Sequence, residues 1–181
     1  MRKVIFGGAS SLDNYFARED GSVDWLIMDA EAMELMRGML DRFDVMIMGR
    51  KTWSASMANF SEEELRKAEE MSNGMRSVVF SRTLEPGRSG GYEIVNTDPR
   101  EFVRDLKEQD GKDICVMGGG ELAFELFEAG VIDEVGFNIH PLLLGSGIPI
   151  FHRMSRQIDL ELLECRPMKN GCVYVLYGVK N

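Results

Sequence analysis

Cysteine is scarce in this sequence. Only Cys115, Cys165 and Cys172 are present, and no Cys-x-x-Cys pair occurs. An odd number without paired spacing argues against a disulfide framework and against a zinc site, so we expect reduced thiols and no metal. Basic residues are also outnumbered, 21 against 30 acidic ones, which gives a net charge of −9. This balance argues against broad binding to nucleic acid or anionic membranes, whereas a small anionic ligand needs only a few local cations.

Long apolar runs are missing as well. A membrane helix needs about 20 apolar residues in succession, and the run that follows Met1-Arg2-Lys3 is too short even for a signal peptide. We therefore expect a cytoplasmic protein with no membrane partner. The 181 residues are 44% hydrophobic and 28% charged, which suits one domain over residues 1–181 that folds around a continuous core.

The spacing of apolar residues changes repeatedly between about two and about 3.6, which is typical of alternating strands and helices. Eight strands are predicted, at 3–8, 44–48, 77–80, 92–95, 113–117, 132–140, 157–166 and 172–179. Helices are predicted at 29–42 with Asp29 as cap, from Ser61 to a stop at Asn73-Gly74, from Asp98-Pro99 and at 121–129, with a further short one at 51–57. Residues 10–22 and 86–91 are predicted as loop and turn. The early alternation favours a mostly parallel sheet, and Asn170-Gly171 predicts an antiparallel hairpin at the C-terminus.

Three predicted strand ends share one property, because each meets a glycine or hydroxyl residue and then a helix or a cation. The first is Met48-Gly49-Arg50-Lys51-Thr52-Trp53. A glycine lets the backbone turn closely, and a helix N-terminus presents free N–H groups and a partial positive charge. With two cations and a hydroxyl beside it, this segment is typical of a phosphate site. The alternative is a basic surface loop.

The second strand end is Val116-Met117-Gly118-Gly119-Gly120-Glu121-Leu122, where three glycines would let a phosphate lie against bare backbone. It does not follow the Gly-x-Gly-x-x-Gly pattern of a Rossmann site. The third is Phe80-Ser81-Arg82-Thr83, whose arginine could hold a further monophosphate in a forked geometry. Ligands of α/β sheets gather beyond the carboxyl ends of strands, so the three segments together predict one anion-binding edge.

These segments resemble the dihydrofolate-reductase-like superfamily. The resemblance is closest to its riboflavin-biosynthesis branch, the reductase domain (RibD C-terminal domain) of the bifunctional deaminase/reductase and small stand-alone bacterial relatives. The residues that carry it are Ser11-Leu12-Asp13-Asn14-Tyr15-Phe16-Ala17, Asp24-Trp25-Leu26, Met48–Trp53, Phe80–Leu84, Met117–Leu122 and Pro141–Phe151. The resemblance implies a three-layer α/β/α fold, an NADPH-dependent reductase and a homodimer that pairs through its late strands.

The resemblance also implies a role for each matching position. Gly49, Arg50, Lys51 and Thr52 would hold the pyrophosphate and adenosine side of NADPH, and Ser81, Arg82 and Thr83 the adenosine ribose with its 2′-phosphate. Met117, Gly118, Gly119, Gly120, Glu121 and Leu122 would line the pyrophosphate and nicotinamide side, and Gly8 and Ala9 would approach the nicotinamide. The Gly118–Gly119 bond is expected to be cis. Asp13 to Trp25 would cover the substrate, with Asn14 and Trp25 as contacts. The alternative for Trp25 is a place in the core.

The sequence also departs from its relatives. Ala30 stands where dihydrofolate reductases carry the carboxylate that assists proton transfer, with Asp29 and Glu31 beside it, and Met75 stands at the folate-tail arginine position, next to Arg76. Asp13, Asp29, Glu31 or water could supply the proton. We predict hydride transfer to a C=N or C=O carbon of a small flat heterocyclic or ribosylaminopyrimidine-like substrate. An NADPH-binding regulatory module without turnover, a true dihydrofolate reductase and a scaffold without a nucleotide site are the alternatives.

Overall fold

The computed structural model describes residues 1–59, 61–71, 74–151 and 154–180. Its strands are β1 (Val4–Ser11), β2 (Tyr15–Ala17), β3 (Phe43–Gly49), β4 (Arg76–Phe80), β5 (Gly87–Ser89), β6 (Tyr92–Val95), β7 (Asp113–Met117), β8 (Glu134–His140), β9 (Ile148–Pro149), β10 (Leu160–Pro167) and β11 (Val173–Val179). Its helices are α1 (Ala30–Leu40), α2 (Arg50–Asn59), α3 (Glu62–Met71), α4 (Pro99–Glu108) and α5 (Gly120–Glu128).

The described residues form one sheet of nine strands in the order β10-β11-β8-β1-β7-β3-β4-β6-β5, and a second sheet of β2 and β9. The run from β8 to β6 is parallel throughout. Antiparallel pairs lie at the two margins, β8–β11–β10 on one side and β6–β5 on the other. The predicted fold class, a mostly parallel sheet that ends in an antiparallel hairpin, is therefore confirmed.

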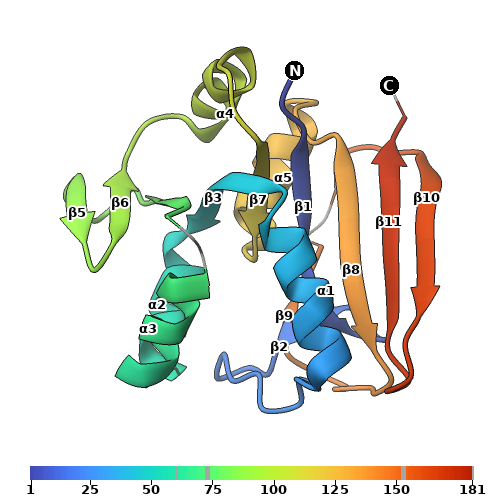
Figure 1. Ribbon diagram of the computed structural model, residues 1–181. Coiled ribbons are helices and arrows are strands. Elements are labelled where there is room, and N and C mark those ends of the chain that lie inside the picture. The colour runs from blue at the N-terminus through green and yellow to red at the C-terminus, as the bar shows by residue number, and fades with distance from the viewer. Residues whose placement is uncertain (60, 72–73, 152–153, 181) are drawn as a thin grey trace.

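Apolar side chains fill both faces of the sheet. Helices cover both faces, so the fold has three layers (Figure 1). On one face Val103 and Leu106 of α4 and Leu126 of α5 pack in a cluster with β1, β3 and β7. On the other face Ala32 and Leu35 of α1 pack with side chains of β1, β7 and β11. Figure 1 shows α1 crossing the near face of the sheet, with α5 behind it.

Two helix starts follow the predicted local chemistry. The Asp29 side chain accepts a hydrogen bond from the backbone N–H of Ala32, and the Asp98 side chain accepts one from Arg100 at the start of α4. Each bond satisfies a backbone donor that the first helical turn leaves free. Both predicted caps are therefore confirmed. Asn73, predicted to help end the helix after Ser61, lies outside the described residues.

The predicted elements need three corrections, two in the strands and one in a helix. The sheet has nine strands rather than eight because Gly87–Ser89, predicted as turn, pairs with β6. The predicted loop 10–22 contains the end of β1 and all of β2, which pairs with β9 through Tyr15 and Ala17. The short segments β2, β5 and β9 gain their regular structure from distant partners, so the local apolar pattern gave no signal for them. The predicted short helix at 51–57 is longer, Arg50–Asn59.

Candidate functional site

The three turns singled out in the sequence end neighbouring strands. Met117, the last residue of β7, pairs with Gly7 of β1 and with Met48 of β3. Gly49, which ends β3, pairs with Phe80, which ends β4. Because β7, β3 and β4 are parallel neighbours, the turns that follow them leave the sheet at one edge, side by side. We call this place the carboxyl edge.

Two helix N-termini meet at the carboxyl edge. Helix α2 begins at Arg50, directly after β3, and α5 begins at Gly120, after the glycine turn. Gly118 and Gly119 have φ angles of 59° and 66°, in the left-handed region that glycine adopts without strain. No cis peptide bond occurs among the described residues, so the predicted cis bond between these glycines is wrong. Two successive left-handed residues turn the chain into α5 instead.

Thr52 of α2 fills the space beside the glycine turn. A Cβ atom at residue 118 would lie 2.6 Å from Cγ2 of Thr52, and one at residue 119 would lie 3.3 Å from its Oγ1. The two predicted phosphate-binding segments are thus in direct contact. Beside Gly49, in contrast, a Cβ would meet nothing within 4 Å, so the backbone at the end of β3 is open to a ligand. A half-buried backbone with open space beside it, between two helix N-termini, fits a phosphate group.

The turn after β4 depends on a buried serine. The Ser81 hydroxyl oxygen accepts hydrogen bonds from the backbone N–H groups of Thr83 (3.2 Å) and Leu84 (2.9 Å). These two donors are therefore used within the turn. The Arg82 side chain points into solvent, with 86% of its surface exposed. The positive charge that this turn offers to an anion is that of Arg82.

Two cations of the site pair with carboxylates of α5. Lys51 Nζ lies 2.7 Å from Glu121 Oε1, and Arg82 Nη2 lies 2.5 Å from Glu125 Oε1. Glu121 was predicted as a site residue, but Glu125 was not, because nothing in the local sequence distinguishes it from other helical glutamates. Its relation to the site follows only from the fold, which packs α5 against β3 and brings Glu125 to Arg82. Arg50, the remaining predicted cation, is exposed.

Asp13, a candidate proton donor, holds two loops together. It accepts hydrogen bonds from the Ser11 hydroxyl (2.6 Å) and from the backbone N–H groups of Leu144 (3.1 Å) and Gly145 (2.8 Å). These bonds, led by that from Ser11, lower the pKa of Asp13 below its ordinary value. A carboxyl group with a lowered pKa carries no proton near neutral pH, so this geometry suits positioning better than proton donation.

The other two candidate carboxylates also bind backbone donors. Asp29 caps α1, and the bond from Ala32 leads the hydrogen bonds that lower its pKa. Glu31 Oε2 accepts the backbone N–H of Lys169 at 2.9 Å, in the turn between β10 and β11. Both side chains thus have structural partners, and their catalytic role remains a prediction.

The predicted substrate contacts, Asn14 and Trp25, and the predicted nicotinamide contacts, Gly8 and Ala9, are spread over the beginning of the chain. Trp25 is buried, and its ring meets the His140 ring edge-on at 5.1 Å between centroids. Asn14 is exposed and has a left-handed backbone, with φ of 65°. Gly8 and Ala9 lie near the end of β1, where Ala9 pairs with Asn138 of β8. Burial lowers the pKa of His140 below its ordinary value.

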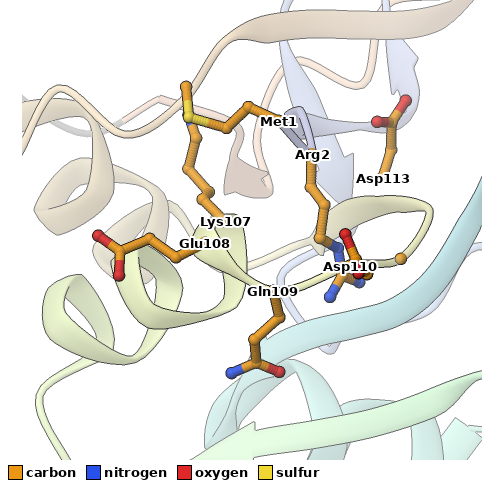
Figure 2. A pocket seen from close by; sticks show the side chains of 8 residues that line it. Met1, Arg2, Lys107, Glu108, Gln109, Asp110 and Asp113 are labelled. Atoms are coloured by element: carbon orange, nitrogen blue, oxygen red, sulfur yellow. The ribbon is translucent and has the colours of Figure 1, made fainter.

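A polar hollow of about 460 Å³ opens at the opposite, amino edge of the sheet (Figure 2). Met1, Arg2, Lys107 and Asp110 are among the residues that line it. The Arg2 and Lys107 side chains are already paired, because Arg2 binds Asp44 and Lys107 binds Asp133. None of the predicted site residues lines this hollow, so it is separate from the carboxyl edge.

Among the described residues, no helix is long and apolar enough to cross a bilayer. Nor does the same part of the chain bring three His, Cys, Asp or Glu side chains together in a group that could hold a metal ion.

The arrangement of the sheet and its two helical layers is similar to the fold of dihydrofolate reductases. Dihydrofolate reductase from Enterococcus faecalis, solved in complex with NADP(H) and RAB-propyl, has a TM-score of 0.68 at 14% identity, covering 99% of this chain and 97% of that one. A putative riboflavin biosynthesis protein from Shewanella sp. PV-4 is more similar, with a TM-score of 0.76 at 21% identity over 100% of both chains.

The chain belongs to the RibD C-terminal domain family, whose sequence model matches residues 2–174. The uncharacterized protein YyaP of Bacillus subtilis (strain 168) is 29% identical to it in an alignment that covers 98% of this chain and 95% of YyaP. The family that the sequence resembled is therefore confirmed.

Proposed function

We propose that the chain is an NADPH-dependent reductase that transfers hydride to a C=N or C=O carbon of a small flat heterocyclic or ribosylaminopyrimidine-like substrate. The observation that carries the proposal is the meeting of three strand-end turns and two helix N-termini at one edge of the sheet. The open backbone at Gly49 and the exposed cations Arg50 and Arg82 support it. Membership of the RibD C-terminal domain family and the NADP(H) complex of a similarly folded reductase point the same way.

Each turn has its part in the proposed site. Residues 49–52 would hold the pyrophosphate and adenosine side, residues 81–83 the ribose and its 2′-phosphate, and residues 117–122 the pyrophosphate and nicotinamide side. Bound NADPH would supply the hydride. The protein would contribute position and electrostatics, which convert an encounter in solution into an oriented reaction.

A second candidate is an NADPH-binding module without turnover. One observation favours it, since Asp13, Asp29 and Glu31 all accept backbone N–H groups rather than facing an open donor position. A true dihydrofolate reductase is less well supported. Arg76, next to the folate-tail position, is held by Glu93 through two hydrogen bonds of 2.9 and 3.1 Å.

Cofactor binding tests the first proposal. We expect the purified protein to change the fluorescence of NADPH when it binds. The Arg82→Ala variant should bind NADPH about tenfold or more weakly than the wild type, because hydrogen bonds to a charged group are strong. Its affinity for NADH, which has no 2′-phosphate, should fall much less. Arg37→Ala, an exposed cation on α1, is the matched control. Equal losses for the two cofactors would contradict the role of Arg82.

Turnover separates the enzyme from the module. The enzyme should oxidise NADPH in the presence of at least one member of a panel of pterins, ribosylaminopyrimidines and small imines. The module should bind NADPH and oxidise none. Absence of binding to either nicotinamide cofactor would remove both candidates.

We also propose a homodimer that pairs through β10, the margin of the sheet. This strand exposes three leucines, Leu160 (40%), Leu162 (53%) and Leu163 (50%). Unpaired edge strands with apolar side chains are templates for pairing. Antiparallel pairing of two copies, centred between residues 163 and 164, would set Glu161 of each opposite Arg166 of the other.

A further inference from the structure

Glu125 lies on the α5 surface that faces the turn after β4. Its Oε1 is 2.5 Å from Nη2 of Arg82. The two side chains differ in exposure, with 31% for Glu125 and 86% for Arg82, so the carboxylate is held against the protein while the guanidinium reaches over it from solvent. The pair joins α5, which follows β7, to the turn two strands away.

We propose that Glu125 sets the preference between NADPH and NADH by competing with the 2′-phosphate for Arg82. The inference rests on the proposed function, because it needs a nicotinamide cofactor at the carboxyl edge. A guanidinium binds carboxylates and phosphates with the same forked set of N–H donors, so the two anions are alternatives for one cation. A 2′-phosphate at Arg82 would have to displace the Glu125 carboxylate or lie beside its negative charge.

The surroundings of Arg82 offer little to offset this competition. The backbone N–H groups of Thr83 and Leu84 already donate to the Ser81 hydroxyl oxygen. Arg100, whose charge interacts with Glu125, is itself bound by its side chain to Asp98. Whether Arg82 is paired with Glu125 therefore decides how much positive charge a phosphate meets at this turn.

The competition is a moderate one. Exposed ion pairs are weak, so we expect the need to displace Glu125 to lower the affinity of the protein for NADPH about two- to fivefold at low salt. The cost should shrink as salt rises, because ions screen exposed charges. NADH leaves the Arg82–Glu125 pair intact and should be indifferent to it. Glu125 thus acts as a specificity-determining residue that reduces the preference for NADPH.

The experiment measures dissociation constants of NADPH and NADH for the whole chain at low and high salt. The variants are Glu125→Gln, Glu125→Ala, Arg82→Ala and the double variant Arg82→Ala/Glu125→Gln. Glu108→Gln is the control, since it makes the same change of charge at the opposite edge of the sheet. Both Glu125 variants should bind NADPH about two- to fivefold more tightly at low salt, with NADH and the control unchanged. In the Arg82→Ala background the gain should disappear.

Three outcomes would overturn the inference. The first is an unchanged or weaker affinity of both Glu125 variants for NADPH while the wild type binds it. The second is an equal gain in the affinity of the Glu125 variants for NADH, which would indicate a general effect of charge. The third is a gain that persists without Arg82. A wild type that binds neither cofactor would be a different failure, that of the proposed function itself.

Discussion

Gly118 and Thr52 show, at the scale of single residues, how closely the parts of the carboxyl edge are fitted together. Gly118 has a left-handed backbone, and Thr52 lies so close to it that only glycine, which has no side chain, fits there. A side chain there would have to adopt a strained φ and displace Thr52, which belongs to the other predicted phosphate segment. One methyl group would therefore disturb two of the three turns.

We expect Gly118→Ala to lower the free energy of unfolding by about 2–4 kcal/mol, from the left-handed backbone and the overpacking against Thr52. Urea denaturation checks the loss of stability. Gly38→Ala is the control, because a Cβ at this exposed position of α1 meets nothing within 4 Å, and alanine there should stabilise by up to about 1 kcal/mol. A Gly118→Ala variant that unfolds at the urea midpoint of the wild type would contradict the account.

At the scale of elements, α4 depends on the Asp98 cap. The Asp98 carboxylate binds the side chain and the backbone N–H of Arg100, in that order of importance, and both bonds lower its pKa. A carboxyl group whose pKa is lower in the folded state adds stability above its ordinary pKa of 3.8. This contribution is lost as the pH falls through the folded value.

Asp98→Asn keeps a capping side chain but removes the charge. We expect its urea midpoint to lie below that of the wild type at pH 6, and the difference to narrow as the pH falls below 3.8. Asp105→Asn, on the exposed surface of the same helix, controls for net charge. A difference that stays constant from pH 6 to pH 2 would show that the charge of Asp98 is not what matters.

The elements that could be predicted are those with a local cause. Asp29 and Asp98 predict the starts of their helices because a cap binds backbone donors only two or three residues away. The glycine turn and the β3–α2 turn could be found because their residue types are unusual at a strand end. Segments β2, β5 and β9 could not, since each owes its structure to a partner strand. Glu125 was missed for the same reason, because Arg82 lies 43 residues away in the sequence.

At the scale of the whole molecule, β10 leaves an apolar margin on the sheet. Leu162→Asp places a charge at the middle of the proposed contact between two copies, and we expect it to shift the protein from dimer to monomer. Light scattering after size exclusion, over a range of concentrations, measures the mass. Leu143→Asp makes the same change at a leucine that is 70% exposed outside β10 and should leave the dimer intact. A wild type that is monomeric at every concentration would refute the proposal.

The position of β1 has a consequence for biosynthesis. The first strand of the chain lies in the interior of the sheet, where Val4 pairs with Ile114 of β7 and Ile5 with Glu134 of β8. During translation at roughly 5–20 residues per second, this strand waits on the order of ten seconds for its partners to leave the ribosome. Val4, Ile5 and Phe6, all buried in the finished protein, stay exposed in the nascent chain over that interval, which makes them the natural place for a chaperone to bind.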